Sequence, residues 1–260
     1  MTPVSSGGAG QGRSGNDFAI GIVGNLGPVA SWRLYGDLIM LFQKRRRATR
    51  NSQFPRINVD APESIENVRE VDDSGDLAKL RRSVDRLNSS NVDLIAIPCN
   101  TVGRYRDELQ RTSQAHILDI VEETVNSVAK ASISRRPYLL ATRRTIRSQR
   151  YQKQLLRRGI KTEVPGEKVQ EWVDLLIDKI CAGDNSVRMC DVLARLAEDS
   201  VFRKSADGVI LGCTELSEIT RSLTNPLSSP RVESTTPVYD SLWSLSVAAY
   251  RESCRIVDRN

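Results

Sequence analysis

Histidine is nearly absent from this chain of 260 residues, since His116 is the only one. Metal sites with two or three imidazole ligands are therefore excluded, and a Ser-His-Asp or Cys-His pair would have to use this one side chain. His116 precedes a short apolar stretch, which favours a packed or surface histidine over a catalytic one. Long hydrophobic runs are also absent, because none approaches the roughly 20 residues of a membrane span. We therefore expect neither a metal site nor a membrane partner.

The chain also lacks the pattern of an export signal. Residues 1–16 are rich in Gly, Ser and polar side chains and contain no apolar core segment, which indicates a disordered tail. Five cysteines are an odd number for a disulfide framework. We therefore expect free thiols in a reducing cytoplasm.

Basic residues outnumber acidic ones and give a net charge of +6. The densest basic run is Lys44 to Arg47, but aromatic residues do not interleave with it as a single-strand nucleic-acid platform requires. Because cations are favoured at helix C-termini, we interpret the run as the exposed end of a helix that starts near Pro28. We expect no nucleic-acid partner.

Two stretches of the chain follow nearly the same pattern. Each begins with an aspartate, continues through an apolar run and a Pro or Gly, and ends in a cysteine followed by small polar residues. Asp93 precedes Cys99 by six positions, and Asp207 precedes Cys213 by six. Apolar runs of this length indicate buried strands of a parallel sheet. Each cysteine would then follow the C-terminal end of a strand, where open α/β sheets bind their ligands.

The periodicity predicts a chain in which strands alternate with helices. The predicted strands are residues 18–23, 56–60, 94–97, 117–120, 138–141 and 208–211, and the predicted helices are 28–47, 75–90, 169–181, 187–201 and 239–257. This order is typical of βαβ units and a parallel sheet. The repeated cysteine pattern favours two similar lobes over one wide sheet. We expect a tail of residues 1–16, a first lobe of 17–114 plus 238–260, and a second lobe of 115–237, with 225–237 as a crossover.

Three short segments are candidates for chemistry. The turn from Gly24 to Pro28 joins a strand to a helix, where glycines allow close approach of a ligand and free N–H groups favour an anion. A plain tight turn is the alternative interpretation. Cys99 and Cys213 would have lowered pKa values at helix N-termini, which makes the reactive thiolate available. The alternative is a pair of buried, inert cysteines, while Cys181, Cys190 and Cys254 fall inside helical patterns.

Five stretches together resemble the aspartate/glutamate racemase family. They are residues 21–28 (GIVGNLGP), 97–101 (IPCNT), 119–124 (DIVEET), 207–215 (DGVILGCTE) and 237–242 (PVYDSL). The resemblance covers nearly the whole chain and is most specific in the two cysteine motifs. It implies two pseudo-symmetric α/β lobes with the active site between them, a homodimer, and activity without pyridoxal phosphate or metal.

The resemblance also implies the reaction, an amino-acid racemisation or epimerisation. One cysteine thiolate removes the Cα proton and the other thiol reprotonates the opposite face, with Cys99 acting on the D-enantiomer and Cys213 on the L-enantiomer. Two acid/base groups on opposite walls are needed, because a single base returns the proton to the face it came from. The residues that match family positions near the ligand are Gly24, Asn25, Gly27, Asn100, Thr101, Thr142, Thr145, Thr214 and Glu215.

The chain departs from the family pattern where the substrate side chain is bound. The loop of residues 60–67 has no Arg, and Glu171 stands where relatives with acidic substrates carry Lys. Arg144 and Gln149 replace glycines of the loop after Thr142. From Glu171 we expect aspartate and glutamate to be poor substrates, unless Arg143 or Arg144 supplies a cation.

Two other functions fit the same fold. A maleate-type isomerase or a decarboxylase of small diacids would keep the cleft and change the reaction. A ligand-binding protein without catalytic activity would keep only the binding site.

Overall fold

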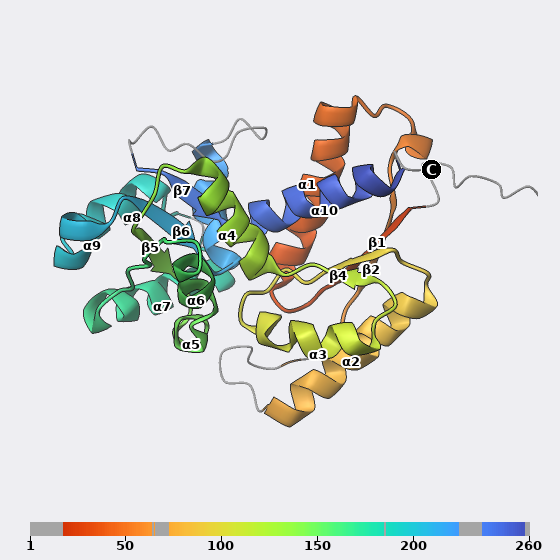
Figure 1. The fold of residues 1–260 in the computed structure, drawn as a ribbon, viewed down its shortest axis with the longest axis horizontal. Helices are drawn as coiled ribbons and strands as arrows, with labels where there is room; N and C mark the ends of the chain where they lie inside the picture. Colours follow the sequence, from red (N-terminus) through yellow and green to blue (C-terminus); the bar gives the residue numbers. More distant parts are fainter. Residues whose placement is uncertain (1–17, 64, 66–72, 185, 224–235, 258–260) are drawn as a thin grey trace, which may run out of the picture.

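The computed structural model describes residues 18–63, 65, 73–184, 186–223 and 236–257, and it contains two separate parallel sheets (Figure 1). The first sheet has the strand order β2-β1-β3-β4 and the second has the order β5-β6-β7. The strands are β1 Ala19–Val23, β2 Arg56–Asp60, β3 Leu94–Ala96, β4 His116–Ile117, β5 Pro137–Leu140, β6 Gly208–Leu211 and β7 Val238–Asp240. The α/β prediction is confirmed, and the two sheets form two lobes.

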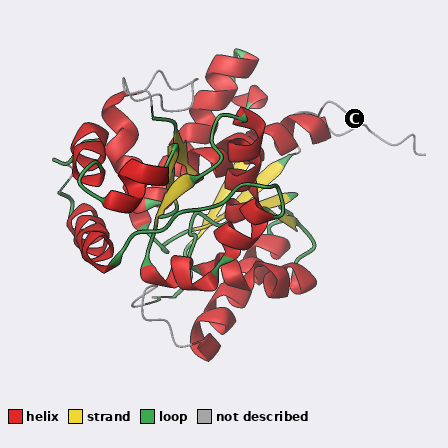
Figure 2. Ribbon diagram, turned by 60° about the vertical axis from the view of Figure 1, so that its left-hand side comes forward, coloured by secondary structure: helices red, strands yellow, loops and turns green. Residues whose placement is uncertain are grey.

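Helices surround both sheets (Figure 2). They are α1 Pro28–Arg46, α2 Asp73–Ser89, α3 Arg106–Thr112, α4 Ile120–Ala131, α5 Arg143–Ser148, α6 Arg150–Leu156, α7 Glu167–Cys181, α8 Met189–Leu196, α9 Ser200–Ser205 and α10 Ser241–Val257. Strands β1, β3, β5, β6 and β7 are buried along their whole length. This burial explains why the sequences of β1, β3 and β6 are continuous apolar runs without alternation.

Helix α1 follows the local signals of its sequence. Pro28 stands at its first position, where the missing N–H costs nothing, and its last turn carries Lys44, Arg45 and Arg46. The interpretation of this basic run as a helix end is therefore confirmed. None of the helices within the described part of the chain is long and apolar enough to cross a membrane.

One hydrophobic cluster joins the two lobes. It contains Ile20 of β1, Leu139 of β5, Ile210 of β6 and Leu245 of α10. Helix α10 lies beside α1 and α4, so the end of the chain returns from the second sheet to the first lobe (Figure 1). On α1, the Arg33 side chain donates to the Ser217 carbonyl at 2.6 Å, which also ties the lobes together.

Three predicted elements were wrong in their bounds. The helix expected at 187–201 is two helices, because α8 ends at Leu196 and Asp199 starts α9 by accepting the N–H groups of Val201 and Phe202. The strand expected at 117–120 is β4, which ends at Ile117, because Asp119 caps α4 by accepting the N–H groups of Val121 and Glu122. The helix expected from residue 239 begins at Ser241, after the strand β7. Strand β4 pairs with the first sheet and β7 with the second. Both lie just beyond the lobe boundaries expected at 115 and 238. The expected tail and most of the crossover at 225–237 lie outside the described residues.

Candidate active site

Cys99 and Cys213 occupy equivalent places in the two sheets. Cys99 follows β3, the neighbour of the central β1, and Cys213 follows β6, the middle strand of the second sheet. Both side chains are buried, with 5% and 6% exposed. The charge of Glu215 contributes to raising the pKa of both thiols, after the larger effect of burial. The structure therefore brings the two sequence motifs into one site.

Glu215 links Cys213 to the opposite lobe. Its Oε2 accepts a hydrogen bond from the Cys213 thiol at 2.9 Å and another from the Thr214 hydroxyl at 3.2 Å. Its Oε1 lies so close to Gly27 that a Cβ at that position would collide with it. Since Gly27 caps the N-terminus of α1, the carboxylate lies at the positive end of that helix, where a negative charge is favoured.

Three threonine hydroxyls connect the lobes on the other side of the site. Thr101 follows the Cys99 motif, and its hydroxyl lies 3.3 Å from that of Thr142 and 3.5 Å from that of Thr145. Thr142 follows β5 and caps α5 by accepting the Thr145 N–H at 3.3 Å. All three side chains are buried. Thr101, Thr142 and Thr145, three of the predicted site residues, therefore lie together.

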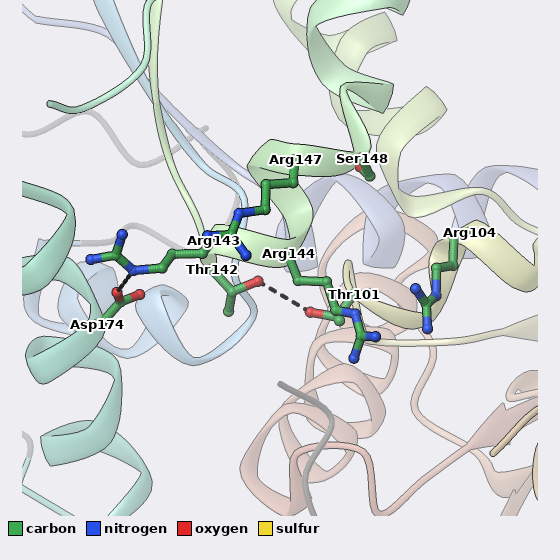
Figure 3. A pocket seen from close by; sticks show the side chains of 8 residues that line it. All are labelled: Thr101, Arg104, Thr142, Arg143, Arg144, Arg147, Ser148 and Asp174. Atoms are coloured by element: carbon green, nitrogen blue, oxygen red, sulfur yellow. Dashed lines mark hydrogen bonds and ion pairs between the residues drawn. The ribbon is translucent and has the colours of Figure 1, made fainter. Parts of the chain in front are cut away.

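A pocket of about 690 Å³ opens beside these threonines (Figure 3). Its lining residues are Thr101, Arg104, Thr142, Arg143, Arg144, Arg147, Ser148 and Asp174. Arg143 turns to α7, where it pairs with Asp174 at 2.7 Å and with Glu167 at 2.7 Å. Figure 3 shows Arg104 and Arg144 bringing their guanidinium groups toward Thr101. Four cations against one carboxylate make the described wall of the pocket positive.

Helix α7 presents Asp174 to the pocket and turns Glu171 away. Gln170 is buried and donates to the Ala141 carbonyl at 3.0 Å and to Asp174 Oδ1 at 2.9 Å, which fixes the inner face of the helix. Glu171 is exposed on the face that also carries Leu175 and does not line the pocket. Glu171, predicted as a substrate contact, therefore lies outside the described lining of this pocket. The pocket wall itself gives no repulsion of an acidic substrate by Glu171.

Both thiols have raised pKa values, in contrast to the lowering that we expected. Burial raises the pKa of Cys99 to about 12, and the charge of Glu215 adds to the effect. Burial and Glu215 likewise hold the pKa of Cys213 well above its usual range. The segments after the cysteines are 3₁₀ helices, Val102–Tyr105 and Glu215–Leu223, and not α-helices. The N–H groups of Thr101 and Val102 favour the Cys99 thiolate, but they offset burial only in part.

The remaining predicted residues divide between the surface and the interior. Asn25 is exposed and adopts a left-handed backbone with φ of 56°, and the neighbouring Gly24 donates its N–H to the Asp60 carbonyl at 2.8 Å. Asn100 is buried, and its side-chain amide bonds to Tyr151 and Ser241. Cys181 and Cys190 are exposed and Cys254 is half-buried, so these three thiols lie outside the site.

Sequence reasoning missed several residues of the site. Asp174 lies next to Val173 on the buried face of α7, so the helical periodicity contained a signal for it. Tyr151, Ser241 and Arg147 had no such signal, because their places depend on contacts between distant segments. Among the described residues, no three His, Cys, Asp or Glu side chains gather where they could hold a metal ion.

The chain is similar to known amino-acid racemases in sequence. The model of the Asp/Glu/hydantoin racemase family matches residues 23–247. A broad-specificity amino-acid racemase, RacX of Bacillus subtilis, is 27% identical over 201 residues, which cover 77% of this chain and 86% of that protein. A glutamate racemase of Aquifex aeolicus is 29% identical over 147 residues, covering 56% of this chain and 55% of that protein.

Solved structures share the fold. The Picrophilus torridus aspartate racemase superposes with a TM-score of 0.70 at 22% identity, covering 93% of this chain and 99% of that one. A putative Asp/Glu racemase from Yersinia pestis superposes with a TM-score of 0.71 at 18% identity, covering 91% and 99%. The family model spans both cysteine motifs and both sheets, and the chain therefore belongs to the Asp/Glu/hydantoin racemase family.

Proposed function

We propose that this amino-acid racemase, an isomerase, inverts the Cα centre of its substrate with Cys99 and Cys213 as the two acid/base groups. The observation that carries the proposal is the placement of two buried thiols at equivalent strand ends of the two sheets. Gly24, Asn25 and Gly27, together with Thr101, Thr142, Thr145 and Thr214, would surround the substrate between the two lobes.

Glu215 is the group that would accept a proton from one of the two thiols. Because both thiols are protonated in the resting site, one of them must lose its proton before it can act as a base. Glu215 Oε2 already accepts the Cys213 thiol hydrogen and would take that proton. The Cys213 thiolate then removes the Cα proton of one enantiomer, and the Cys99 thiol donates its own proton to the opposite face. The reverse reaction uses the same groups in the opposite order.

Solvent deuterium incorporation tests the two-base reaction. Each enantiomer of a candidate amino acid is incubated in deuterated water, and the product is analysed by chiral chromatography and mass spectrometry. A two-thiol racemase places one deuterium at Cα of the inverted product, because the donated proton comes from a solvent-exchanged thiol. A diacid isomerase or decarboxylase gives no such label. A binding protein gives only a thermal shift, so an unlabelled amino-acid panel would refute the proposal.

The charge of the pocket supports a substrate with an anionic side chain. Arg104, Arg144 and Arg147 line its wall, and Asp174, the one carboxylate among the described lining residues, is already paired with Arg143. A carboxylate in such a site gains charge-assisted hydrogen bonds from guanidinium groups. We therefore replace the expectation of poor acidic substrates with a preference for them.

Variant kinetics test this preference. We expect Arg144→Gln to lower kcat/KM for the acidic substrates by roughly tenfold to a hundredfold, as for the loss of a charged hydrogen bond. Arg157→Gln, an exposed position outside the pocket lining, is the matched control, and Glu171→Lys should also change little. Serine, lysine and arginine complete the panel. Wild-type preference for a cationic amino acid would contradict the proposal.

An apolar face on α1 supports a homodimer. Val29, Trp32 and Tyr35 are 40%, 63% and 43% exposed and follow one another at intervals of three residues. Exposed aromatic side chains are enriched at the centres of protein interfaces. We expect light scattering to give a dimer mass for the wild type and a monomer mass for Trp32→Ser. Leu175→Ser, equally exposed on α7, should leave the dimer intact. A monomeric wild type would contradict this assignment.

A further inference from the structure

The side-chain amide of Asn100, next to Cys99, is held at both ends. Its Oδ1 accepts the Tyr151 hydroxyl at 2.7 Å, and its Nδ2 donates to the Ser241 hydroxyl at 2.9 Å. Tyr151 and Ser241 are fully buried, and Asn100 is 5% exposed. Both the carbonyl and the amino end of this amide therefore already bind protein groups. These two bonds fix the segment that carries Cys99.

The partners of Asn100 come from distant parts of the chain. Tyr151 lies in the first turn of α6, after β5, while Ser241 begins α10, after β7. The Tyr151 hydroxyl also lies 3.3 Å from that of Thr124 on α4. A residue of the first sheet's cysteine motif is thus held by elements that follow strands of the second sheet. The network is buried and makes several hydrogen bonds, so it is expected to be rigid.

Arg150, the neighbour of Tyr151, holds the same segment from another side. Its Nη2 pairs with Asp119, the cap of α4, at 2.5 Å. Its Nη1 lies against Gly103, only 2.6 Å from the place a Cβ would occupy. Gly103 belongs to the 3₁₀ helix Val102–Tyr105 that follows Cys99. The first turn of α6 therefore contacts the Cys99 segment at both Asn100 and Gly103.

We propose that Tyr151 is a positioning residue for Cys99, which it orients across the lobe boundary through the amide of Asn100. This inference rests on the proposed function of Cys99 as an acid/base group. Tyr151 does not touch the substrate and transfers no proton. Its hydroxyl fixes where the backbone between residues 99 and 102 lies relative to the substrate Cα.

The backbone that Tyr151 holds is the part that acts on the thiol. The N–H groups of Thr101 and Val102 favour the Cys99 thiolate. Both residues lie between Asn100 and Gly103, the two residues that α6 contacts. Without the Tyr151 hydroxyl, the amide of Asn100 keeps only its bond to Ser241, so it shifts and the N–H groups of Thr101 and Val102 move out of line with the thiol. The thiolate is then less stable, and the sulfur is displaced from the Cα proton. A displacement of about 1 Å can lower a rate by about a hundredfold.

Tyr151→Phe tests the inference, with Tyr138→Phe as the matched control. Tyr138 is also fully buried, but it lies in β5 and its ring packs against that of Phe202 in the second lobe. We expect Tyr151→Phe to lower kcat/KM by about tenfold, by the same factor in both directions. The two enantiomers have equal free energies in water, so the ratio of kcat/KM in the two directions is fixed. The substitution must therefore lower both kcat/KM values by the same factor. Tyr138→Phe should leave kcat/KM unchanged.

Alkylation of the resting protein provides a readout that does not depend on turnover. Iodoacetamide labelling of Cys99 and Cys213 is followed separately by peptide mass spectrometry over a pH series. In Tyr151→Phe, the pH midpoint of Cys99 labelling should rise by about half a pH unit, which is a threefold decrease in thiolate at fixed pH. The midpoint of Cys213 labelling should stay unchanged. An unchanged or lowered midpoint for Cys99, or an equal shift at both cysteines, would overturn the inference.

A double variant asks whether Tyr151 acts through Asn100. Tyr151→Phe in an Asn100→Ala background should cost no further activity, whereas independent roles would give multiplied losses. If Tyr151→Phe does not fold, Ser241→Ala removes the partner at the other end of the amide and should shift the Cys99 midpoint in the same direction. Failure of the two-base function would leave the alkylation result intact, so the two hypotheses are tested separately.

Discussion

At the scale of single residues, the resting site stores its two thiols in the protonated form. Cys99 and Cys213 are buried beside the Glu215 carboxylate, and both conditions disfavour a second negative charge. The same carboxylate accepts the hydrogen of Cys213. Bound substrate, with its ammonium group, would relieve this repulsion and allow one thiolate to form.

The raised pKa of Cys99 predicts a loss of stability at alkaline pH. In the unfolded chain the thiol ionises near 9, but in the folded protein it ionises only near 12. The stabilisation is therefore complete below pH 9 and is lost as the pH rises toward 12. Between pH 8 and pH 10.5, the free energy of unfolding measured in urea should fall by about 2 kcal/mol less in Cys99→Ser than in the wild type. The exposed Cys190→Ser should match the wild type, and equal losses in all three would contradict the shift.

Substitution of each cysteine separates the two thiols of the site from the other three. Cys99→Ser and Cys213→Ser should each lower racemisation in both directions to background, because a hydroxyl is far too weak an acid to replace a thiol. Cys181→Ser, Cys190→Ser and Cys254→Ser should keep activity within about twofold, as expected for surface changes. Chiral chromatography of the product measures both directions. A Cys99 or Cys213 variant with full turnover would contradict the two-base reaction.

Residue patterns in the sequence identified the cysteines but not their surroundings. The paired Asp-to-Cys spacing pointed to Cys99 and Cys213, because the strand that ends at each cysteine is a local feature. Glu171 was predicted from the family resemblance, whereas the rotation of α7 about its axis is decided by the burial of Gln170 and Val173. The direction of the thiol pKa shifts depends on burial across two lobes, which no local pattern contains.

At the scale of elements, the start of α1 depends on the absence of a side chain at Gly27. A Cβ there would meet Glu215 Oε1, so Gly27→Ala should displace the carboxylate from Cys213 and lower kcat by about tenfold or more. Gly36→Ala in the same helix is the matched control, since a Cβ there meets nothing within 4 Å. It should raise stability by about 1 kcal/mol and leave kcat unchanged. Equal kinetics in the two variants would contradict the role of Gly27.

Elements with strong local signals were predicted more accurately than elements defined by tertiary contacts. Helix α1 and strands β1, β2 and β6 have strong local signals and lie where the sequence indicated. Strand β7 has only three residues, and its apolar pattern continues into α10, so periodicity alone could not separate the two. Strand β4 has two residues and exists because of its pairing with β3, which is a tertiary effect.

At the scale of the whole molecule, the shared hydrophobic cluster predicts cooperative unfolding of the two lobes. The cluster contains side chains of β1 from one sheet and of β5 and β6 from the other, so neither lobe can open without exposing the other. Pulsed alkylation in urea should give the same midpoint for Cys99 and Cys213. Midpoints that differ by more than about 0.5 M, well beyond the error of such fits, would contradict a single cooperative unit.

The burial of the two thiols has a consequence for oxidative damage. Peroxide attacks thiolates that solvent can reach, and the resting site offers little access and little thiolate at neutral pH, because Cys99 and Cys213 are only 5% and 6% exposed and are protonated. The exposed Cys181 and Cys190 meet the oxidant first. Sulfenic acid should therefore accumulate on the surface of α7 and α8 while turnover is still intact, and the outer thiols would shield the chemistry of the enzyme during oxidative stress.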